Sequence, residues 1–305
     1  MTIRQANRTL SNRNIKVAVV RERVWFWFVA PGVLILIGVV VVPAVRLIVN
    51  SLYQWNILTG VRRFDGLGQY ETVLADTLFI GSIVRTLVFT VAVVITELLL
   101  GLLVATLLAR DFRGARLART AFLTPMLMIP VVVGLLWSLM YQPSIGIVNY
   151  LFHIFGIPPA LWLSSQALAL PAIGIAEVWQ WTPFATMVFV AAMRGLPANV
   201  LAAADLDGTR RLRRLLTIEV PMMRKVILVV FLLRFIDVFK TFALVFIMTR
   251  GGPGHATVLA GYYPWEVGFS EFDMGKASAA AFILLNLITI LTYFLIRPIL
   301  REREA

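Results

Sequence analysis

Six apolar stretches in this sequence are each long enough to cross a lipid bilayer as a helix. A transmembrane α-helix needs about 20 predominantly apolar residues. The stretches cover residues 25–48, 86–108, 120–141, 169–192, 225–249 and 277–299. Charged residues make up 14% of the 305-residue chain, whereas they are about a quarter of an average soluble domain. We therefore predict an all-α polytopic membrane protein in which residues 24–305 form one six-span domain with an uncleaved first span.

The loops between these stretches differ in their content of Lys and Arg. The loops at 110–119 and 194–225 are rich in Arg, whereas 142–168 has no Lys or Arg and 50–84 has only two. The positive-inside rule places the two basic loops in the cytoplasm, together with both termini and the basic N-terminal tail at 1–23. These segments also account for the net charge of +12, so we predict no nucleic-acid partner.

Several kinds of chemistry lack their usual residues in this sequence. The chain has no Cys and only two His, His153 and His255, which lie far apart. Gly275 and Lys276 form the single Gly-Lys pair, but neither the upstream Gly nor the following Ser or Thr of a phosphate-binding loop is present. No Gly-x-Ser-x-Gly motif occurs. We therefore predict no metal site, no catalytic residues and no bound cofactor in this chain.

The basic loop at 194–224 has the pattern of two short helices joined by a turn. Three alanines before Asp205 favour a helix, Gly208 can adopt the left-handed conformation that ends it, and Thr209 is the expected N-cap of the next helix. Pro221 suits the first turn of the following span. In the second helix one face is apolar and consists of Leu212, Leu215 and Leu216.

This loop resembles the EAA loop of the permease subunits of binding-protein-dependent ABC importers, which docks into a cleft of the ATPase. The matching residues are Ala203, Ala204, Leu206, Asp207, Gly208, Ile218 and Pro221. Ala202 stands where the family usually has an acidic residue, and Val220 stands where it has Leu. Asp205, one helical turn along, is the candidate substitute for the acid. The resemblance implies that this loop is a cytoplasmic coupling helix that contacts a separate ATPase.

Three ionisable residues lie three positions apart in the fifth apolar stretch: Arg234, Asp237 and Lys240. Each costs roughly 2.5 to 3.5 kcal/mol on insertion scales unless it has a partner or a wet cavity. The spacing allows Asp237 to pair with both neighbours on one helix face. The pattern resembles the Arg-x-Ile-Asp-x-Phe-Lys motif of the same permeases. Two roles remain open, a structural ion network and the lining of a translocation path.

The fourth stretch carries Glu177, Trp179 and Trp181 shortly before Pro183, and it resembles a Trp-x-Trp-Thr-Pro-Phe segment of these permeases. Tryptophan faces stack on sugar rings and carboxylates accept hydrogen bonds from hydroxyls, so the group suits a polyhydroxylated solute. Tryptophans near a membrane boundary also serve as interface anchors. Outside this stretch, Glu97 and Asn286 have the same two readings, a helix-packing hydrogen bond or a solute contact.

The resemblance covers nearly all of the chain after residue 24, and it is to carbohydrate permeases of the maltose type. It implies one half of a translocation pathway in a bacterial cytoplasmic (inner) membrane. The implied partners are membrane lipid, a second homologous permease, a dimeric ATPase that holds ATP and Mg, an extracytoplasmic solute-binding protein, and a sugar or polyol as substrate. The alternatives are glycerol phosphate as the solute, an ion-coupled secondary transporter, and a membrane enzyme that uses Glu97, Glu177 and His153.

Overall fold

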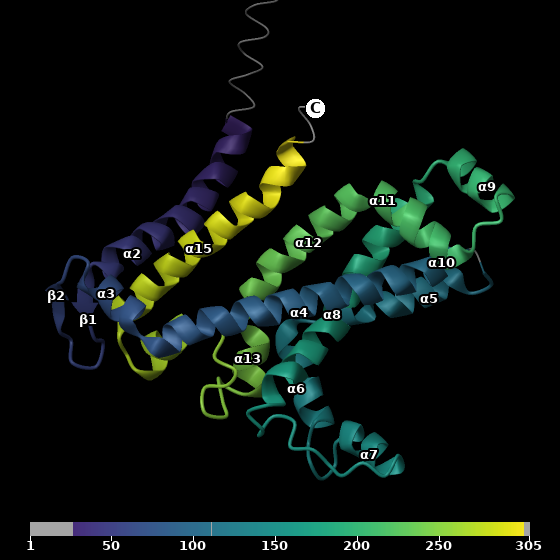
Figure 1. The fold of residues 1–305 in the computed structure, drawn as a ribbon. Coiled ribbons are helices and arrows are strands. Elements are labelled where there is room, and N and C mark those ends of the chain that lie inside the picture. The colour runs from purple at the N-terminus through teal and green to yellow at the C-terminus, as the bar shows by residue number, and fades with distance from the viewer. Residues whose placement is uncertain (1–26, 111, 302–305) are drawn as a thin grey trace, which may run out of the picture.

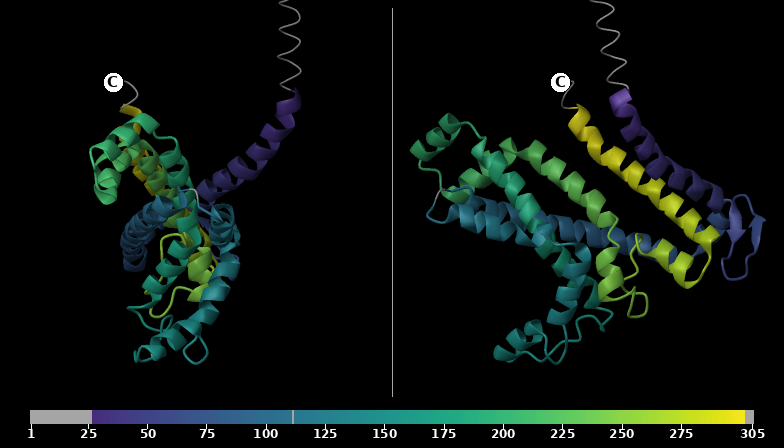
Figure 2. Two further views of the ribbon diagram at one scale, coloured as in Figure 1. Left: turned by 90° about the vertical axis from the view of Figure 1, so that its right-hand side faces the viewer. Right: turned by 180° about the vertical axis from the view of Figure 1, so that it is seen from behind.

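The computed structural model describes residues 27–110 and 112–301, so the predicted basic tail at 1–23 lies outside the described residues. Long helices cross one another at steep angles, and shorter helices and loops gather at their two ends (Figure 1). The helix Trp27–Ser51, which contains η1 (Ile37–Val41) and α2 (Val42–Ser51), diverges from the other helices toward its N-terminal end (Figure 2). Its partner within the chain is the last helix, α15 (Met274–Arg301), beside which α2 packs.

The remaining elements follow in chain order, and a two-stranded hairpin is the exception to the predicted all-α fold. Its strands pair antiparallel, with Tyr53 opposite Phe64. From the hairpin to the loop at 194–224, the elements are β1 (Tyr53–Trp55), β2 (Arg62–Phe64), α3 (Gly68–Ala75), α4 (Thr77–Leu108), α5 (Ala115–Leu123), η2 (Thr124–Leu127), α6 (Pro130–Met140), α7 (Ile147–Ile154) and α8 (Ala169–Arg194). Then come α9 (Ala198–Leu206), α10 (Arg211–Arg214), η3 (Leu215–Glu219), α11 (Val220–Met222), α12 (Arg224–Phe239), α13 (Ala243–Met248), α14 (Tyr263–Trp265) and η4 (Glu266–Ser270).

The apolar stretches do not all form single straight helices. Within the described part of the chain, three helices are long and apolar enough to cross a membrane, or up to five if each bent pair counts as one span. The stretch predicted at 120–141 is bent by 96° between η2 and α6. Ile129 is extended there, with ψ 136°, because the following Pro130 disfavours helical geometry at the residue before it. The stretch predicted at 225–249 is interrupted between α12 and α13.

The core lies where α4 crosses α8. Gly101 of α4 faces Ala185 of α8 so closely that a Cβ added to Gly101 would lie 2.9 Å from the Ala185 Cβ. Around this crossing, Val93 and Val94 of α4 and Phe189 of α8 are almost fully buried. The small residues therefore let two helix backbones approach within the bundle, and this contact fixes the angle between α4 and α8.

Asp76 joins the start of α4 to the start of α15. Its Oδ1 accepts a hydrogen bond from the backbone N–H of Leu78 at 2.8 Å, which explains why α4 begins nine residues before the stretch predicted at 86–108. Its Oδ2 accepts hydrogen bonds from Lys276 Nζ and Tyr263 Oη, both at 2.7 Å. Gly275, beside Lys276, lies where a Cβ would collide with the Tyr53 carbonyl oxygen. The Gly-Lys pair thus serves packing at this end of the molecule.

Replacing Asp76 by Asn is expected to lower stability by about 1 to 2 kcal/mol. Burial raises the pKa of Asp76, but hydrogen bonds from Lys276, Tyr263 and the Leu78 N–H outweigh it and lower the pKa to about 2 from 3.8. Because the folded-state pKa is depressed, this stabilisation is present above pH 3.8 and is lost as the pH falls toward about 2. Thermal unfolding of the detergent-purified protein across this pH range measures the effect.

Asn retains the capping oxygen, so the Asp76→Asn variant removes the charge and keeps the helix start. Glu71→Gln, at an exposed carboxylate of α3, is the matched control and should leave both the stability and its pH dependence unchanged. An unfolding midpoint of Asp76→Asn that falls with acid as steeply as in the parent chain would contradict this assignment.

Candidate functional site

A buried ion cluster forms where α4, α8 and α12 meet. The Arg234 guanidinium binds Glu97 through two hydrogen bonds, Nε to Oε2 and Nη2 to Oε1, each 2.8 Å long. Nη2 also donates to Glu177 Oε1 at 2.9 Å. The side chains are 1%, 0% and 7% exposed for Arg234, Glu97 and Glu177. Since an unpaired charge in a low-dielectric interior is very costly, this cluster holds the three helices in one arrangement.

The cluster opens toward the surface at its other end. Arg234 Nη1 lies 3.9 Å from Asp237 Oδ2, and Lys240 Nζ lies 3.4 Å from Asp237 Oδ1. The side chains of Asp237 and Lys240 are 52% and 58% exposed. The Arg234 guanidinium carbon also stands 4.5 Å from the ring centroid of Trp181, within cation–π range. One row of charges therefore runs from the interior to an accessible surface of α12.

The three-residue spacing correctly predicted the two ion pairs of Asp237, but it missed the main partners of Arg234. Glu97 makes one of the two contacts considered for it, a helix-packing hydrogen bond, and this contact is a bidentate ion pair with Arg234. The sequence could have predicted an ion pair for Glu97. It is the only acidic residue in the stretch 86–108, and a carboxylate at that depth requires a cation. Nothing in the sequence specified which of the basic residues would reach it.

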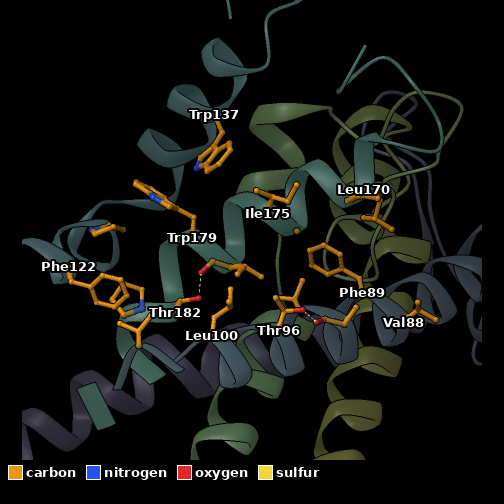
Figure 3. A pocket seen from close by; sticks show the side chains of 18 of the residues that line it. Val88, Phe89, Thr96, Leu100, Phe122, Trp137, Leu170, Ile175, Trp179 and Thr182 are labelled. Carbon is orange, nitrogen blue, oxygen red and sulfur yellow. Dashed lines mark hydrogen bonds between the residues drawn. The ribbon is translucent and has the colours of Figure 1, made fainter. Parts of the chain in front are cut away.

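Trp179 lies on a different face of α8 from Trp181 and lines a pocket of about 850 Å³ between α4, α5 and α8. Its ring meets that of Trp137 edge-to-face, with centroids 5.9 Å apart, and Figure 3 shows the pair across the pocket from Phe89 and Val88. The hydroxyls of the two threonines in the lining already donate to carbonyls of their own helices. The lining is therefore mostly apolar, although the indole N–H of Trp137 has no hydrogen-bond partner among the described residues.

Asn286 stands apart from both the cluster and this pocket. It is exposed on α15, and its Nδ2 donates to the carbonyl oxygen of Phe282 at 2.8 Å, within the same helix. The structure thus brings Glu177, Trp181, Arg234, Asp237 and Lys240 together, and it leaves Trp179 and Asn286 at separate places.

The turn of the basic loop at 194–224 has the predicted left-handed glycine. Gly208 has φ +65°, and the N–H groups of Gly208 and Thr209 donate to the carbonyl oxygens of Asp205 and Ala204. This pair of bonds is a Schellman motif, which satisfies the carbonyl end of α9. The prediction that Thr209 caps the next helix is wrong. That helix, α10, begins at Arg211 without a side-chain cap, because Thr209 is already used as part of the turn.

Ion pairs hold the loop together from inside. Arg214 binds Asp205 and Glu219, so the two short helices are joined across the turn. The Asp205 carboxylate is already paired within the chain, although its side chain is 63% exposed. Of the three leucines predicted on one face, Leu215 packs against the core, whereas Leu212 and Leu216 are 68% and 56% exposed.

The other loop residues named from the sequence occupy different environments. Ala204 is 4% exposed, whereas Leu206 is 90% exposed. Ala203, Asp207 and Pro221 are exposed, and Ile218 is half-buried. Pro221 was predicted in the first turn of the following span, and it lies instead in the separate helix α11, before α12 begins at Arg224. The turn and one apolar edge of the loop are therefore open to a partner.

Arginines attach the loop at 194–224 and its neighbours to the C-terminal end of α4. Arg211 of α10 donates to the Thr106 carbonyl oxygen, and Arg194 of α8 donates to that of Ala109. Arg119 of α5 donates to the Leu108 carbonyl oxygen at 2.7 and 3.0 Å. Cations stabilise the carbonyl end of a helix, where the dipole is negative. The positive-inside rule explained these arginines by membrane topology alone. It gave no indication that they bind the end of α4.

Known proteins resemble this chain over most of its length. Residues 97–303 match the family model for the binding-protein-dependent transport system inner membrane component. A probable ABC transporter permease protein of Sinorhizobium fredii is 35% identical over 84% of this chain and 84% of its own length. A trehalose/maltose transport system permease protein of Thermococcus litoralis is 29% identical over 92% of this chain and 96% of its own length.

Solved structures support the same fold. A chain of a bacterial ABC transporter involved in the import of the acidic polysaccharide alginate superposes with a TM-score of 0.81 at 17% identity, covering 94% of this chain and 99% of that one. Together with the family match over more than half of the sequence, this likeness identifies the molecule. The chain belongs to the family of binding-protein-dependent transport system inner membrane components and is an ABC transporter permease, not an enzyme.

Proposed function

We propose that this chain forms half of the translocation pathway of an ATP-driven importer for a sugar or polyol. The observation that carries the proposal is the loop at 194–224. Its turn is exposed, as are Leu206, Leu212 and Leu216, and it is braced internally by Arg214 and attached to α4 by Arg211. An exposed apolar patch on a loop held in place by such contacts is typical of a docking surface.

The path from the loop to the interior follows α4. The same helix whose end is held by Arg211 carries Glu97, which binds Arg234. Closure of a dimeric ATPase loaded with ATP and Mg would push on the loop, and α4 would pass that displacement to the ion cluster and change the access of the pathway. Ala203, Ala204, Asp207, Gly208, Ile218 and Pro221 shape the contact surface, and Asp205 supports it through Arg214.

The solute is proposed to contact the open end of the ion cluster rather than the 850 Å³ pocket. Asp237 and Lys240 are exposed and can exchange hydrogen bonds with hydroxyls. The hydroxyls lining the pocket are already bonded. The buried Arg234 is neutralised by two carboxylates and Lys240 by Asp237, which favours a neutral solute over a phosphate.

The names of related permeases indicate which solutes those proteins transport. Besides the trehalose/maltose permease protein, a trehalose transport system permease protein of Mycobacterium tuberculosis is 30% identical over 90% of this chain and 88% of its own length. A sn-glycerol-3-phosphate transport system permease protein of Agrobacterium fabrum is 29% identical. Glycerol phosphate is therefore the second candidate solute.

The assembly proposed for this chain contains a second homologous permease, the dimeric ATPase and an extracytoplasmic solute-binding protein. In the membrane, α12 and α13 would together make the fifth of six spans, with both termini in the cytoplasm. A crystal structure of the alginate transporter with its substrate-bound periplasmic protein has a chain of the same fold, with a TM-score of 0.79.

Purification of the tagged chain from its own host in mild detergent tests the assembly. We expect mass spectrometry to identify an ATPase and a second permease in stoichiometric amounts, and solute to stimulate ATP hydrolysis by the complex when the binding protein is added. A folded chain that emerges alone and drives uptake from an ion gradient would overturn the proposal in favour of a secondary transporter.

A further inference from the structure

The segment 141–168, which follows α6 outside the bundle, carries no Asp, Glu, Lys or Arg. Apart from its tyrosines, its one titratable side chain is that of His153. The segment contains the helix α7, which lies beyond the end of α6 and apart from the long helices (Figure 1). A loop exposed to water on all sides would ordinarily be rich in charged residues, so this composition needs a physical cause.

The side chain of Asn149, in α7, faces the protein. Asn149 is 4% exposed, and its Oδ1 accepts hydrogen bonds at 3.0 Å from the Ala160 backbone N–H and from Trp162 Nε1. Its Nδ2 donates to the Ala160 carbonyl oxygen at 3.1 Å. Trp162 in turn stacks on Tyr141, with ring centroids 5.3 Å apart. One amide therefore fixes the helix against the returning chain.

The outward face of α7 is apolar apart from the exposed His153. Tyr150 is 62% exposed, Ile154 is 59% exposed and Phe155, just after the helix, is 78% exposed. Apolar side chains are also exposed before α7, at Leu139 of α6 (64%) and at Ile145 (81%). In a water-soluble helix the polar residues face outward and the apolar residues face the core, and here that pattern is reversed.

We propose that α7 is an interfacial helix that rests on the extracytoplasmic leaflet, with its outward apolar face in contact with lipid. Apolar side chains are exposed both on α7 and at the end of α6, which suits contact with an apolar medium at both places. Aromatic side chains such as Tyr150 and Phe155 suit the boundary between headgroups and acyl chains. The helix then lies in the plane of the membrane surface and anchors the start of α8.

Lipid explains the surface better than a protein partner. A protein interface usually surrounds its apolar centre with a polar and charged rim, and the segment 141–168 has no charged rim. The proposal concerns only the contact with the bilayer, so it stands or fails independently of the ATPase and of the solute.

The natural absence of cysteine makes the contact measurable. Phe155→Cys, labelled with a nitrobenzoxadiazole fluorophore, is compared with Leu58→Cys, whose side chain is 70% exposed in the turn of the β1–β2 hairpin beside Arg62 and Arg63. The full-length chain, with any subunits that accompany it, is placed in nanodiscs of phosphatidylethanolamine and phosphatidylglycerol. Some nanodiscs include phosphatidylcholine carrying a nitroxide on its acyl chain.

We expect the probe at position 155 to emit at shorter wavelength than the probe at position 58. Nitroxide lipids should quench the first probe and aqueous iodide the second. Quenching of the position-155 probe by iodide and not by nitroxide lipid would show a face open to water, and the proposal would fail. A position-155 probe shielded from both quenchers would assign the face to a protein subunit and would equally overturn it.

Discussion

An Arg234→Met variant is expected to accumulate little folded protein and to lose about 3 to 5 kcal/mol of stability if it can be purified. The methionine fills a similar volume but leaves Glu97 and Glu177 buried beside each other without their cation. Fluorescence-detected gel filtration and thermal unfolding in detergent measure the loss. Lys240→Met removes the same charge from an exposed site on the same helix and should cost less than about 1 kcal/mol, as expected for an exposed ion pair.

A compensated variant separates the two roles that the sequence left open for this cluster. Combining Arg234→Met with Glu97→Gln and Glu177→Gln removes the uncompensated charges, so part of the stability should return. Uptake that returns with stability would assign the cluster to structure alone. Restored stability without uptake would place the cluster in the transport mechanism. If Arg234→Met itself remained as stable as the parent chain, the buried network would not have the role argued for it.

A Gly208→Val variant is expected to insert normally and to lose solute uptake. The left-handed conformation at φ +65° costs a side-chain-bearing residue roughly 1 to 2 kcal/mol, and more for a β-branched one. No atom lies within 4 Å of the position that a Cβ would occupy, so the effect is on backbone conformation and stays local. Uptake and ATP hydrolysis by the assembled transporter, normalised to the amount in the membrane, give the readout.

Two further variants control for the loss of a glycine as such. Gly208→Asn should keep much of the uptake, because Asn tolerates the left-handed region. Gly195→Ala, at a glycine with φ −84° and ordinary contacts, should be neutral. Normal uptake by Gly208→Val would show that the geometry of this turn does not matter for coupling.

Long apolar stretches predicted helices well because a single local property specifies them. The fourth stretch, 169–192, is within two residues of α8. Breaks within stretches were harder to predict, because hydropathy does not change at a bend. At Ile129 the cause is the proline that follows it, so this bend could have been predicted from the sequence. The interruption after Phe239 is not followed by a proline. It lies where Gly261, from a loop distant in the sequence, approaches the backbone of Lys240.

The ion cluster could not be assembled from sequence spacing alone. Arg234 and Glu97 are 137 residues apart, and their contact depends on how α4 and α12 cross. Helical spacing identified the weaker contact to Asp237 because both residues lie on one helix. The resemblance to known permeases predicted a coupling role for the loop at 194–224, whereas the attachment of Arg211 to Thr106 follows only from the folded arrangement.

The length of α4 has a mechanical consequence. At 32 residues it extends for about 48 Å as one unbroken helix, more than the roughly 30 Å of a bilayer core, so it must tilt or project beyond it. Glu97, held by Arg234, divides it into an arm of about 30 Å that starts beside Asp76 and an arm of about 17 Å that ends at the arginine-held carbonyl groups. With the ion pair as a fulcrum, a sideways step at the arginine-held end is nearly doubled at Asp76. A small displacement at one end of α4 thereby becomes a larger one at the other.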